Sequence, residues 1–370
     1  MSIAEAGVER AIWEMNYGNI SSWSGSSSQR TLALSSVQAS GGAVVGDISV
    51  TVYNPSAANP VVESTGSVLL NIGLNVTRIV RTILQAGGPP PIFTYGVFGD
   101  KGVSIANNAS INSYDSRLGA YGGANIHHHG NTGTNATSGG AFVLNNNAYL
   151  DGDAITGYQS NPLAVISQGN NSTITGQKAA LTAPKDMPSV PAPAGLAYQG
   201  NYSLSNNGTG TISQSGQYGN FTASNNAVVT ITASVTLYIT GTFTLSNNAQ
   251  FKINPGCAVT MYFGGTWNIS NNSQINNLTQ DPTKLLMYGT DTFVGTKTFY
   301  NNSATYAAIY CPKADLYLSN NGGIYGSVIG NRITQNNNAA IHYDETLGSL
   351  QTGIGTGAAG FTVKSWQEKF

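Results

Sequence analysis

Short runs of asparagine recur along the chain from about residue 100 onward, and this recurrence constrains the fold more than any other feature. The runs share a neighbourhood: an Asn pair, a small residue and then strand-forming residues, as in NNASI, NNAVVTI and NNAQFKI. They lie at 107–108, 145–147, 170–171, 206–207, 225–226, 247–248, 271–272, 301–302, 320–321 and 336–338, and most spacings are 16 to 24 residues. A short period of strand plus turn is typical of a solenoid.

The repeat predicts a mainly β chain with a parallel β-helix over residues 93–347. Stretches of alternating apolar residues, such as residues 228–246, read as strands. Asn tolerates the left-handed backbone conformation at tight bends, and its side-chain amide can bond to the same amide one coil up. The right hand of the helix is the expectation for folds of this kind. An antiparallel sandwich is the alternative, but the hairpin turns that it needs are sparse here.

The rest of the chain differs in pattern. Residues 1–16 are expected to form an N-terminal helix with a partial apolar stripe. Residues 17–86 carry strand patterns broken by Gly, Asn and Pro, and predict a small β-sheet domain. A stiff Pro-rich linker is expected at residues 87–92, since GGPPP can form neither helix nor central strand. Residues 348–370 are assigned to a C-terminal tail or terminal strand.

Charge is scarce and unevenly distributed. Only 8% of the residues are charged, the net charge is −1, and residues 187–251 contain no Asp, Glu, Lys or Arg. The chain therefore has no basic face for nucleic acid. No window approaches the roughly 18 apolar residues of a membrane span. Catalysis by carboxylates, Lys or Arg is excluded from the charge-free stretch.

Four segments, in the same order, resemble one family. SIAEAGVERAIWEMN (residues 2–16) resembles the end of the N-terminal region of PilX-type type IV pilus assembly proteins, where it follows a membrane-spanning helix. The stretch FTYGVFGDKGVSIANNASINSYDSRLGAY (93–121) resembles the opening of the β-helical domain in such surface proteins, and residues 309–347 resemble its last coils. FTVKSWQEKF (361–370) resembles the terminal strand.

The resemblance implies a minor-pilin-like subunit for assembly, surface display or adhesion at the bacterial cell surface, and not an enzyme. The implied partners are other pilus subunits and a host or environmental surface or polysaccharide, with no nucleic acid. The family's leader, peptidase site and apolar helix would precede residue 1. We therefore expect a truncated part of a longer parent, which would be anchored in the inner membrane before assembly. A divergent gene with an internal start is the alternative.

Two acidic residues stand close together within the repeats. Asp151 and Asp153 would share one face of a strand, because side chains at i and i+2 point the same way. They could act together or form a weak Ca²⁺ site, and no other cofactor is expected. The alternative interpretation is a solvated turn.

A histidine run and an acidic pair receive structural interpretations. Three consecutive His residues, 127–129, cannot all point at one ion in an extended strand, and their flanks are loop-like, so a solvated loop is expected. Adventitious metal binding by this run is the alternative. The adjacent Asp344 and Glu345 are interpreted as closing the last coil.

Tyrosines and cysteines supply the remaining candidates. Exposed tyrosines among the 19 could form a stacking surface for sugars or a partner, the alternative being coil packing. The candidates for that ligand-binding surface are Tyr149, Tyr158, Tyr202 and Tyr218. Cys257 and Cys311 fit two buried hydrophobic side chains, or a disulfide in an oxidising compartment.

Two rival functions use the same fold. A secreted polysaccharide lyase or hydrolase would need at least two convergent carboxyl groups. Asp115 and Arg117, together with the acidic pair at 151 and 153, are the residues that could supply such a site. A carbohydrate-binding rod without catalysis would instead present coplanar, exposed tyrosines on one face.

Overall fold

The chain forms two compact units, each described here by itself: residues 1–90 with 355–370, and residues 91–354. This computed structural model describes residues 3–16, 18–38, 44–57, 59–69, 73–87, 91–270, 272–300, 303–319, 322–354 and 359–369. Part of the predicted linker (88–90) and the Asn runs at 301–302 and 320–321, with Asn271, lie outside these residues. The predicted mainly β chain with a short N-terminal helix and a small sheet is confirmed.

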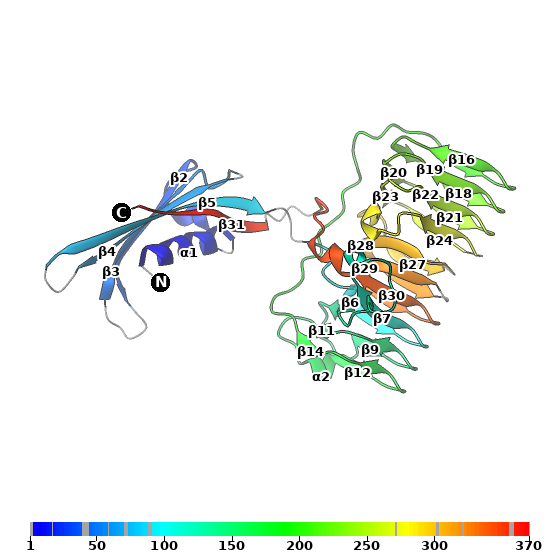
Figure 1. The fold of residues 1–370 in the computed structure, drawn as a ribbon, viewed down its shortest axis with the longest axis horizontal. Coiled ribbons are helices and arrows are strands. Elements are labelled where there is room, and N and C mark those ends of the chain that lie inside the picture. The colour runs from blue at the N-terminus through cyan, green and yellow to red at the C-terminus, as the bar shows by residue number, and fades with distance from the viewer. Residues whose placement is uncertain are drawn as a thin grey trace. The chain divides into compact units, whose positions relative to one another are not determined.

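The first unit is a helix on an antiparallel sheet, with strands in the order β1–β2–β3–β4–β5–β31 (Figure 1). Its elements are α1 (Ile3–Asn16), η1 (Ile20–Ser22), β1 (Ser24–Ser26), β2 (Gln29–Gln38), β3 (Val44–Tyr53), β4 (Val61–Leu69), β5 (Asn75–Gly87) and β31 (Ala359–Lys369). The helix buries Ala4, Val8 and Ala11 in the same apolar cluster as Val50 and Val62 of the sheet. Apolar burial at this one interface therefore holds the unit together.

Close approach of α1 to the sheet depends on two glycines. A Cβ on Gly7 would lie 2.1 Å from Ser64 Oγ, and one on Gly66 would lie 2.7 Å from the backbone nitrogen of Ala4. Any larger residue at either position would push the helix away from β4. No helix among the described residues has the length and apolarity that crossing a bilayer requires.

The last strand completes this sheet. β31 pairs antiparallel with β5, so the two strands that flank the second unit in sequence are neighbours. Arg78 on β5 forms ion pairs with Glu5 of α1, at 3.2 Å, and with Glu368 of β31. The Asn16 side chain, at the end of α1, exchanges hydrogen bonds with the backbone of Phe361. The second unit is thus inserted between two neighbouring strands of the first.

The second unit consists of parallel sheets. In its first half lie β6 (Val97–Ile105), β7 (Ser110–Tyr114), η2 (Ser116–Leu118), β8 (Thr132–Thr134), β9 (Phe142–Leu144), β10 (Tyr149–Leu150), β11 (Ala154–Thr156), α2 (Pro162–Val165), β12 (Ile166–Gln168), β13 (Thr173–Ile174) and β14 (Lys178–Ala180). Then come β15 (Tyr202–Leu204), β16 (Thr209–Ile212), β17 (Gly216–Tyr218), β18 (Phe221–Ser224), β19 (Val228–Ile231), β20 (Val235–Ile239), β21 (Thr242–Ser246) and β22 (Gln250–Ile253). The last elements are β23 (Val259–Phe263), β24 (Thr266–Ile269), β25 (Gln274–Asn277), η3 (Pro282–Lys284), β26 (Leu285–Gly289), β27 (Gly295–Tyr300), β28 (Thr305–Ser319), β29 (Gly323–Gln335), β30 (Ala340–Asp344) and η4 (Glu345–Ser349).

Equivalent residues of successive repeats stack on one another. Phe221 on β18 is the register partner of Phe243 on β21, which is the partner of Trp267 on β24. Phe243 is fully buried, and its ring centroid lies 5.3 Å from that of Phe221 and 5.6 Å from that of Phe263. Because apolar and polar residues alternate along each strand, the apolar side chains point inward and stack in a continuous row inside the unit.

The strand order in space departs from the order along the chain. A solenoid wound in chain order would place residues 93–121 at one end and 309–347 at the other. Instead, β6 pairs on one side with β29 and on the other with β8 and β9, while β7 likewise lies between β30 and β10. The first and last strands of the unit are therefore neighbours inside the stack.

One extended segment makes this order possible. After β14 the chain runs as the green trace of Figure 1 past the other strands to β15 and β16. Val190 is fully buried along this path, and its carbonyl accepts a hydrogen bond of 3.1 Å from the Asp291 backbone. The carbonyl of Pro188 accepts a bond of 2.6 Å from the Tyr310 hydroxyl.

The asparagine runs that the structure describes contain the left-handed bends that were predicted for them. Asn225 and Asn226, for example, have φ angles of 54° and 63°, in the left-handed region that few side chains tolerate. The Asn226 amide donates to Asn207 Oδ1 at 3.1 Å and accepts from Asn248 at 3.2 Å. The bends at 206–207, 225–226 and 247–248 are therefore bonded to one another through their side-chain amides.

Candidate metal centre

The loop of residues 115–130, between β7 and β8, departs from the regular bends. Asp115 caps η2 by accepting from the Arg117 backbone at 2.9 Å, and its carboxylate also binds the Arg117 guanidinium, at 2.5 Å for the closest pair. The Asn125 amide donates to the Asp115 and Gly119 carbonyls, at 3.0 Å each. These bonds fold the loop back on itself and give it a defined path.

Ser113, buried on β7, aligns the end of this loop. Its backbone forms an antiparallel bridge with His127, with hydrogen bonds of 2.8 and 3.1 Å. The backbone nitrogen of His129 donates to the Ser113 hydroxyl at 2.9 Å. In an extended segment the side chains at i and i+2 share a face, so His127 and His129 point the same way while His128 points away.

Glu345 approaches the same place from the other end of the unit's sequence. Residues 340–344 pair in register with residues 110–114, which brings the end of β30 beside the end of β7. Asp344 caps η4, because its carboxylate accepts from the Thr346 backbone at 3.1 Å. Glu345 is the first residue of η4, so this cap fixes where its side chain projects.

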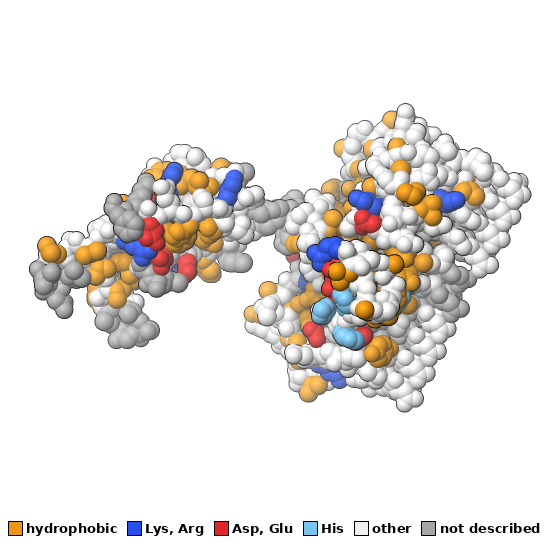
Figure 2. All heavy atoms as spheres, viewed as in Figure 1, with side chains coloured by type: hydrophobic (Ala, Val, Ile, Leu, Met, Phe, Trp, Pro, Cys, Tyr) orange, Lys and Arg blue, Asp and Glu red, His pale blue; other side chains and the backbone are white. Residues whose placement is uncertain are grey.

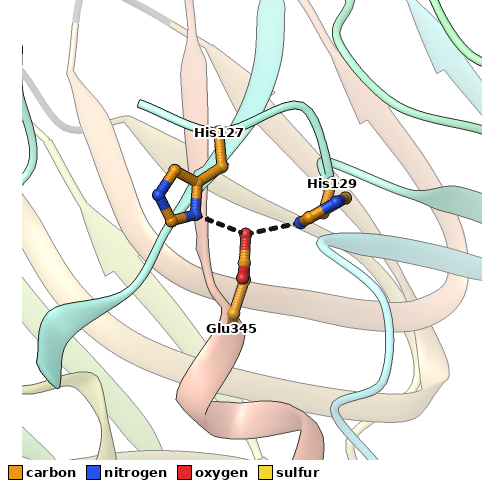
Figure 3. A group of neighbouring side chains, drawn as sticks. All are labelled: His127, His129 and Glu345. Carbon is orange, nitrogen blue, oxygen red and sulfur yellow. Dashed lines mark hydrogen bonds and ion pairs between the residues drawn. The ribbon is translucent and has the colours of Figure 1, made fainter. Parts of the chain in front are cut away.

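Three potential metal ligands therefore converge. Figure 3 shows His127 and His129 reaching the Glu345 carboxylate from two sides. Their Nδ1 atoms lie 3.0 and 2.9 Å from the same oxygen, Oε1, and the three ligand atoms are all within 4.8 Å of one another. Ser113 Oγ donates to that oxygen as well, at 2.9 Å. Among the described residues, these three form a group whose ligand atoms are close enough together to hold a metal ion.

Electrostatics favour a charged carboxylate at this place. Burial raises the pKa of Glu345, but hydrogen bonds from His129, Ser113 and His127 outweigh it and hold that pKa below its ordinary value. The His127 and Glu345 side chains are about one-quarter exposed, at 25% and 23%, whereas that of His129 is 68% exposed. The cluster thus consists of the charged Glu345 carboxylate and two imidazoles, and it is open to solvent on the side of His129.

A neighbouring aromatic stack holds the loop against the sheet. The ring centroids of Tyr121 and His342 lie 3.9 Å apart. Those of His342 and Tyr325, on the neighbouring strand β29, lie 4.6 Å apart. Asn112 links the stack by binding His342 Nδ1 at 2.7 Å and donating to the Tyr121 hydroxyl at 2.8 Å. Burial lowers the pKa of His342 to about 4, so its ring is neutral near pH 7.

The predicted acidic pair is engaged by other groups. Asp151, which is buried, binds His128 Nδ1 and the Thr175 hydroxyl at 2.8 Å each. Asp153 accepts from the backbone nitrogen of Gln177 at 2.7 Å. The weak Ca²⁺ site at this pair stays a prediction. The interpretation of residues 127–129 as a solvated loop describes only part of their setting, because two of the three histidines meet Glu345.

The tyrosine candidates fall into two groups. Tyr149 and Tyr158 are exposed, by 42% and 41%. Tyr202 instead stacks on Phe221, with ring centroids 4.5 Å apart, and Tyr218 is buried. These four tyrosines therefore do not form the exposed, coplanar surface that a carbohydrate-binding rod requires. A ligand-binding role for them stays a prediction.

The cysteines stand apart as thiols. Cys257 and Cys311 are both free and buried in this structure, which does not join them in the disulfide considered above. Burial raises the pKa of the Cys311 thiol to about 12. Such a thiol is protonated and unreactive near neutral pH.

Sequence reasoning missed Glu345 as a partner of the histidines, which lie 218 and 216 residues earlier. The available signals were separate: an alternate-residue pair of histidines at 127 and 129, and an acidic residue in the motif at 342–345 that was identified as a closing coil. Nothing in the sequence shows that β30 and β7 are neighbours.

Comparisons with known proteins are sparse. Residues 197–350 match a family described as a domain of unknown function (DUF7305), which is less than half of the chain and includes Glu345 but not the two histidines. No curated protein matches. A crystal structure of the competence-associated pilin ComZ from Thermus thermophilus aligns with 12% identity, over 99% of this chain and 96% of that chain. Its TM-score of 0.30 is too low to establish a shared fold.

Proposed function

We propose that this chain is a non-enzymatic subunit of a type IV pilus system, which contributes to assembly, surface display or adhesion. The observation that carries the proposal is the order of the units along the chain: a helix-on-sheet unit is completed by the neighbouring strands β5 and β31, and the unit of parallel strands is inserted between these two strands in sequence. The helix bears the AEAGVERA stretch that resembles PilX-type proteins. In this proposal the first unit engages other pilus subunits, and the second is displayed at the cell surface.

The second unit is, in this proposal, the right-handed parallel β-helix expected from the sequence. Three observations support that finer fold: parallel pairing between its named strands, register partners 22 to 24 residues apart in the region of β18 to β24, and asparagine bends bonded to one another from residue 207 to residue 248. A rod of this kind would suit display, because its surface over residues 187–251 carries no charge and its amides are paired.

The rival enzyme reading has less support. Asp115 is bound by its own Arg117, while Asp151 and Asp153 bind different partners, so no pair of carboxyl groups among them is left free for acid–base work. The sugar-binding rod keeps two exposed tyrosines, Tyr149 and Tyr158.

The proposal can be tested in cells with type IV pili that carry the gene for this chain. Antibodies against the second unit should label the sheared pilus fraction in wild-type cells, and deletion should reduce piliation or attachment. A matched variant is Gly7→Leu, which should displace α1 from β4 and remove the chain from that fraction. Finding the protein free in the medium, with normal pili and attachment in the deletion strain, would overturn the proposal.

A further inference from the structure

We propose that His127, His129 and Glu345 bind one Zn²⁺ ion, which ties the loop of residues 115–130 to η4. This inference does not depend on the pilus proposal, because it concerns only contacts within the second unit. Figure 2 shows histidine side chains beside acidic and basic ones on one face of that unit. Residues 187–251, by contrast, contain no charged side chain.

The spacing of the ligand atoms fits a metal ion. Zn–N and Zn–O bonds of about 2.0–2.1 Å place neighbouring ligand atoms of a tetrahedral site about 3.3 Å apart. The Nδ1 atoms of His127 and His129 lie 3.0 and 2.9 Å from Glu345 Oε1. These two nitrogen–oxygen distances differ from that spacing by only a few tenths of an ångström. The two histidine ligand atoms, which lie within 4.8 Å of each other, would close on the ion, and water can complete the coordination from the exposed side.

The number of contacts at Glu345 Oε1 also favours an ion. Oε1 receives three contacts, from two imidazole nitrogens and from the Ser113 hydroxyl, whereas a carboxylate oxygen has about two lone pairs to offer. Without an ion both imidazoles must present an N–H to one crowded atom. A cation between them removes this crowding, because each Nδ1 then offers its lone pair to the metal.

Supporting groups hold the ligands in place. Ser113 contacts all three ligand residues: its backbone bridges His127, its hydroxyl accepts from the His129 backbone, and it donates to Glu345. Such outer contacts orient metal ligands and reduce the reorganisation that binding requires. Two imidazoles and one carboxylate suit Zn²⁺, whereas Ca²⁺ prefers six to eight oxygen ligands.

The run of histidines contains its own control. His128 is 78% exposed, binds Asp151, and points away from the cluster. If histidine content alone captured zinc, His128→Gln would weaken binding as much as His129→Gln does. If the cluster binds zinc, only the second change matters, and Glu345→Gln matters too although it preserves the shape of the side chain.

The experiment is titration of the metal-free full chain with ZnCl₂ by calorimetry, with CaCl₂ as the comparison. We expect one Zn²⁺ per chain and a loss of at least about tenfold in affinity for His129→Gln and for Glu345→Gln, with His128→Gln unchanged. Circular dichroism of each metal-free variant confirms that it is folded. Zn²⁺ should also slow proteolysis within residues 119–124 in the wild type and in His128→Gln.

Three results would overturn the inference. The first is no zinc binding at 100-fold excess over the protein. The second is equal weakening by His128→Gln and His129→Gln, which would mean an adventitious ion on a histidine run. The third is undiminished binding by Glu345→Gln, which would remove the link between the loop and η4.

Discussion

The stack of strands from β15 to β25 and the loop of residues 115–130 belong to the same unit but are built by different means. In the stack, one bend of each repeat uses left-handed asparagines, as at residues 225–226 and 247–248, and the strand residues pair in register with their equivalents one repeat away. In the loop, each contact is made once: Asp115 with Arg117, Tyr121 with His342, and His127 with Glu345.

From this difference we infer that the repeated strands mainly stabilise the unit, whereas the irregular loop brings together the side chains that can bind a ligand or a proton. The stack has no charged residue over residues 187–251. The loop, in contrast, carries His127 and His129, which meet Glu345. Variants in the stack should therefore change stability with little dependence on pH, and variants around the loop should change pH dependence and metal binding.

The largest expected effect is in the stack core. Phe243→Ala would remove a fully buried ring that lies between Phe221 and Phe263, and should lower the free energy of unfolding by about 3–5 kcal/mol. Urea unfolding followed by far-UV circular dichroism measures this. A decrease in the free energy of unfolding below about 1 kcal/mol would mean that the row of stacked aromatic rings is not the core of the stack.

The next effect is a pH dependence confined to the neighbourhood of the loop. Because the folded-state pKa of His342 is lowered to about 4, the unfolded chain binds a proton more readily, and stability is lost as pH falls from about 6.5 to 4. A shift of this size corresponds to a few kcal/mol at most. Hydrogen exchange, corrected for the intrinsic rate at each pH, should show β30 and the loop loosening in this window while β18 to β22 do not.

His342→Phe is the matched variant for that window. It keeps a ring between Tyr121 and Tyr325 but removes the titrating group. The pH dependence of exchange in β30 should then flatten between pH 6.5 and 4. An unchanged slope in the variant would show that another group causes the acid loss.

A smaller effect separates the two roles of the bend asparagines. Asn226→Ala should cost about 1–2 kcal/mol for the left-handed conformation, in addition to the lost amide bonds. Asn226→Gly keeps the conformation and loses only the bonds, so it should cost less. Thermal unfolding of both variants gives the difference, and equal losses would assign the stability to the amide bonds alone.

The smallest effect is expected at the exposed tyrosines. Tyr149→Ser should change stability by less than about 0.5 kcal/mol, because this side chain is 42% exposed. Tyr202→Ser should cost clearly more, since it removes a ring stacked on Phe221. Similar melting temperatures for the two variants would contradict the packed position of Tyr202.

The sequence predicted what repeats and missed what occurs once. Runs such as Asn225 with Asn226 predict a left-handed bend, because few other residues adopt that conformation. Alternating apolar and polar residues predict strands. The placement of β6 beside β29 could not be predicted, since neighbouring repeats are interchangeable in pattern and many strand orders satisfy the same periodicity. Glu345 was therefore assigned to coil closure, although that closing position is what delivers it to His127 and His129.

The neighbouring positions of the first and last strands are the central claim, because they create the candidate metal centre. The most direct test is a short bismaleimide cross-link between Ser104→Cys on β6 and Thr334→Cys on β29, which are register partners. Neighbouring strands lie about 4.8 Å apart, so this pair should link as efficiently as Thr222→Cys with Thr244→Cys on β18 and β21. The pair Ser104→Cys with Thr222→Cys, on strands that are not neighbours, should not link. Efficient linking of the first pair within one chain supports the account, whereas its absence while the β18–β21 pair links would contradict it.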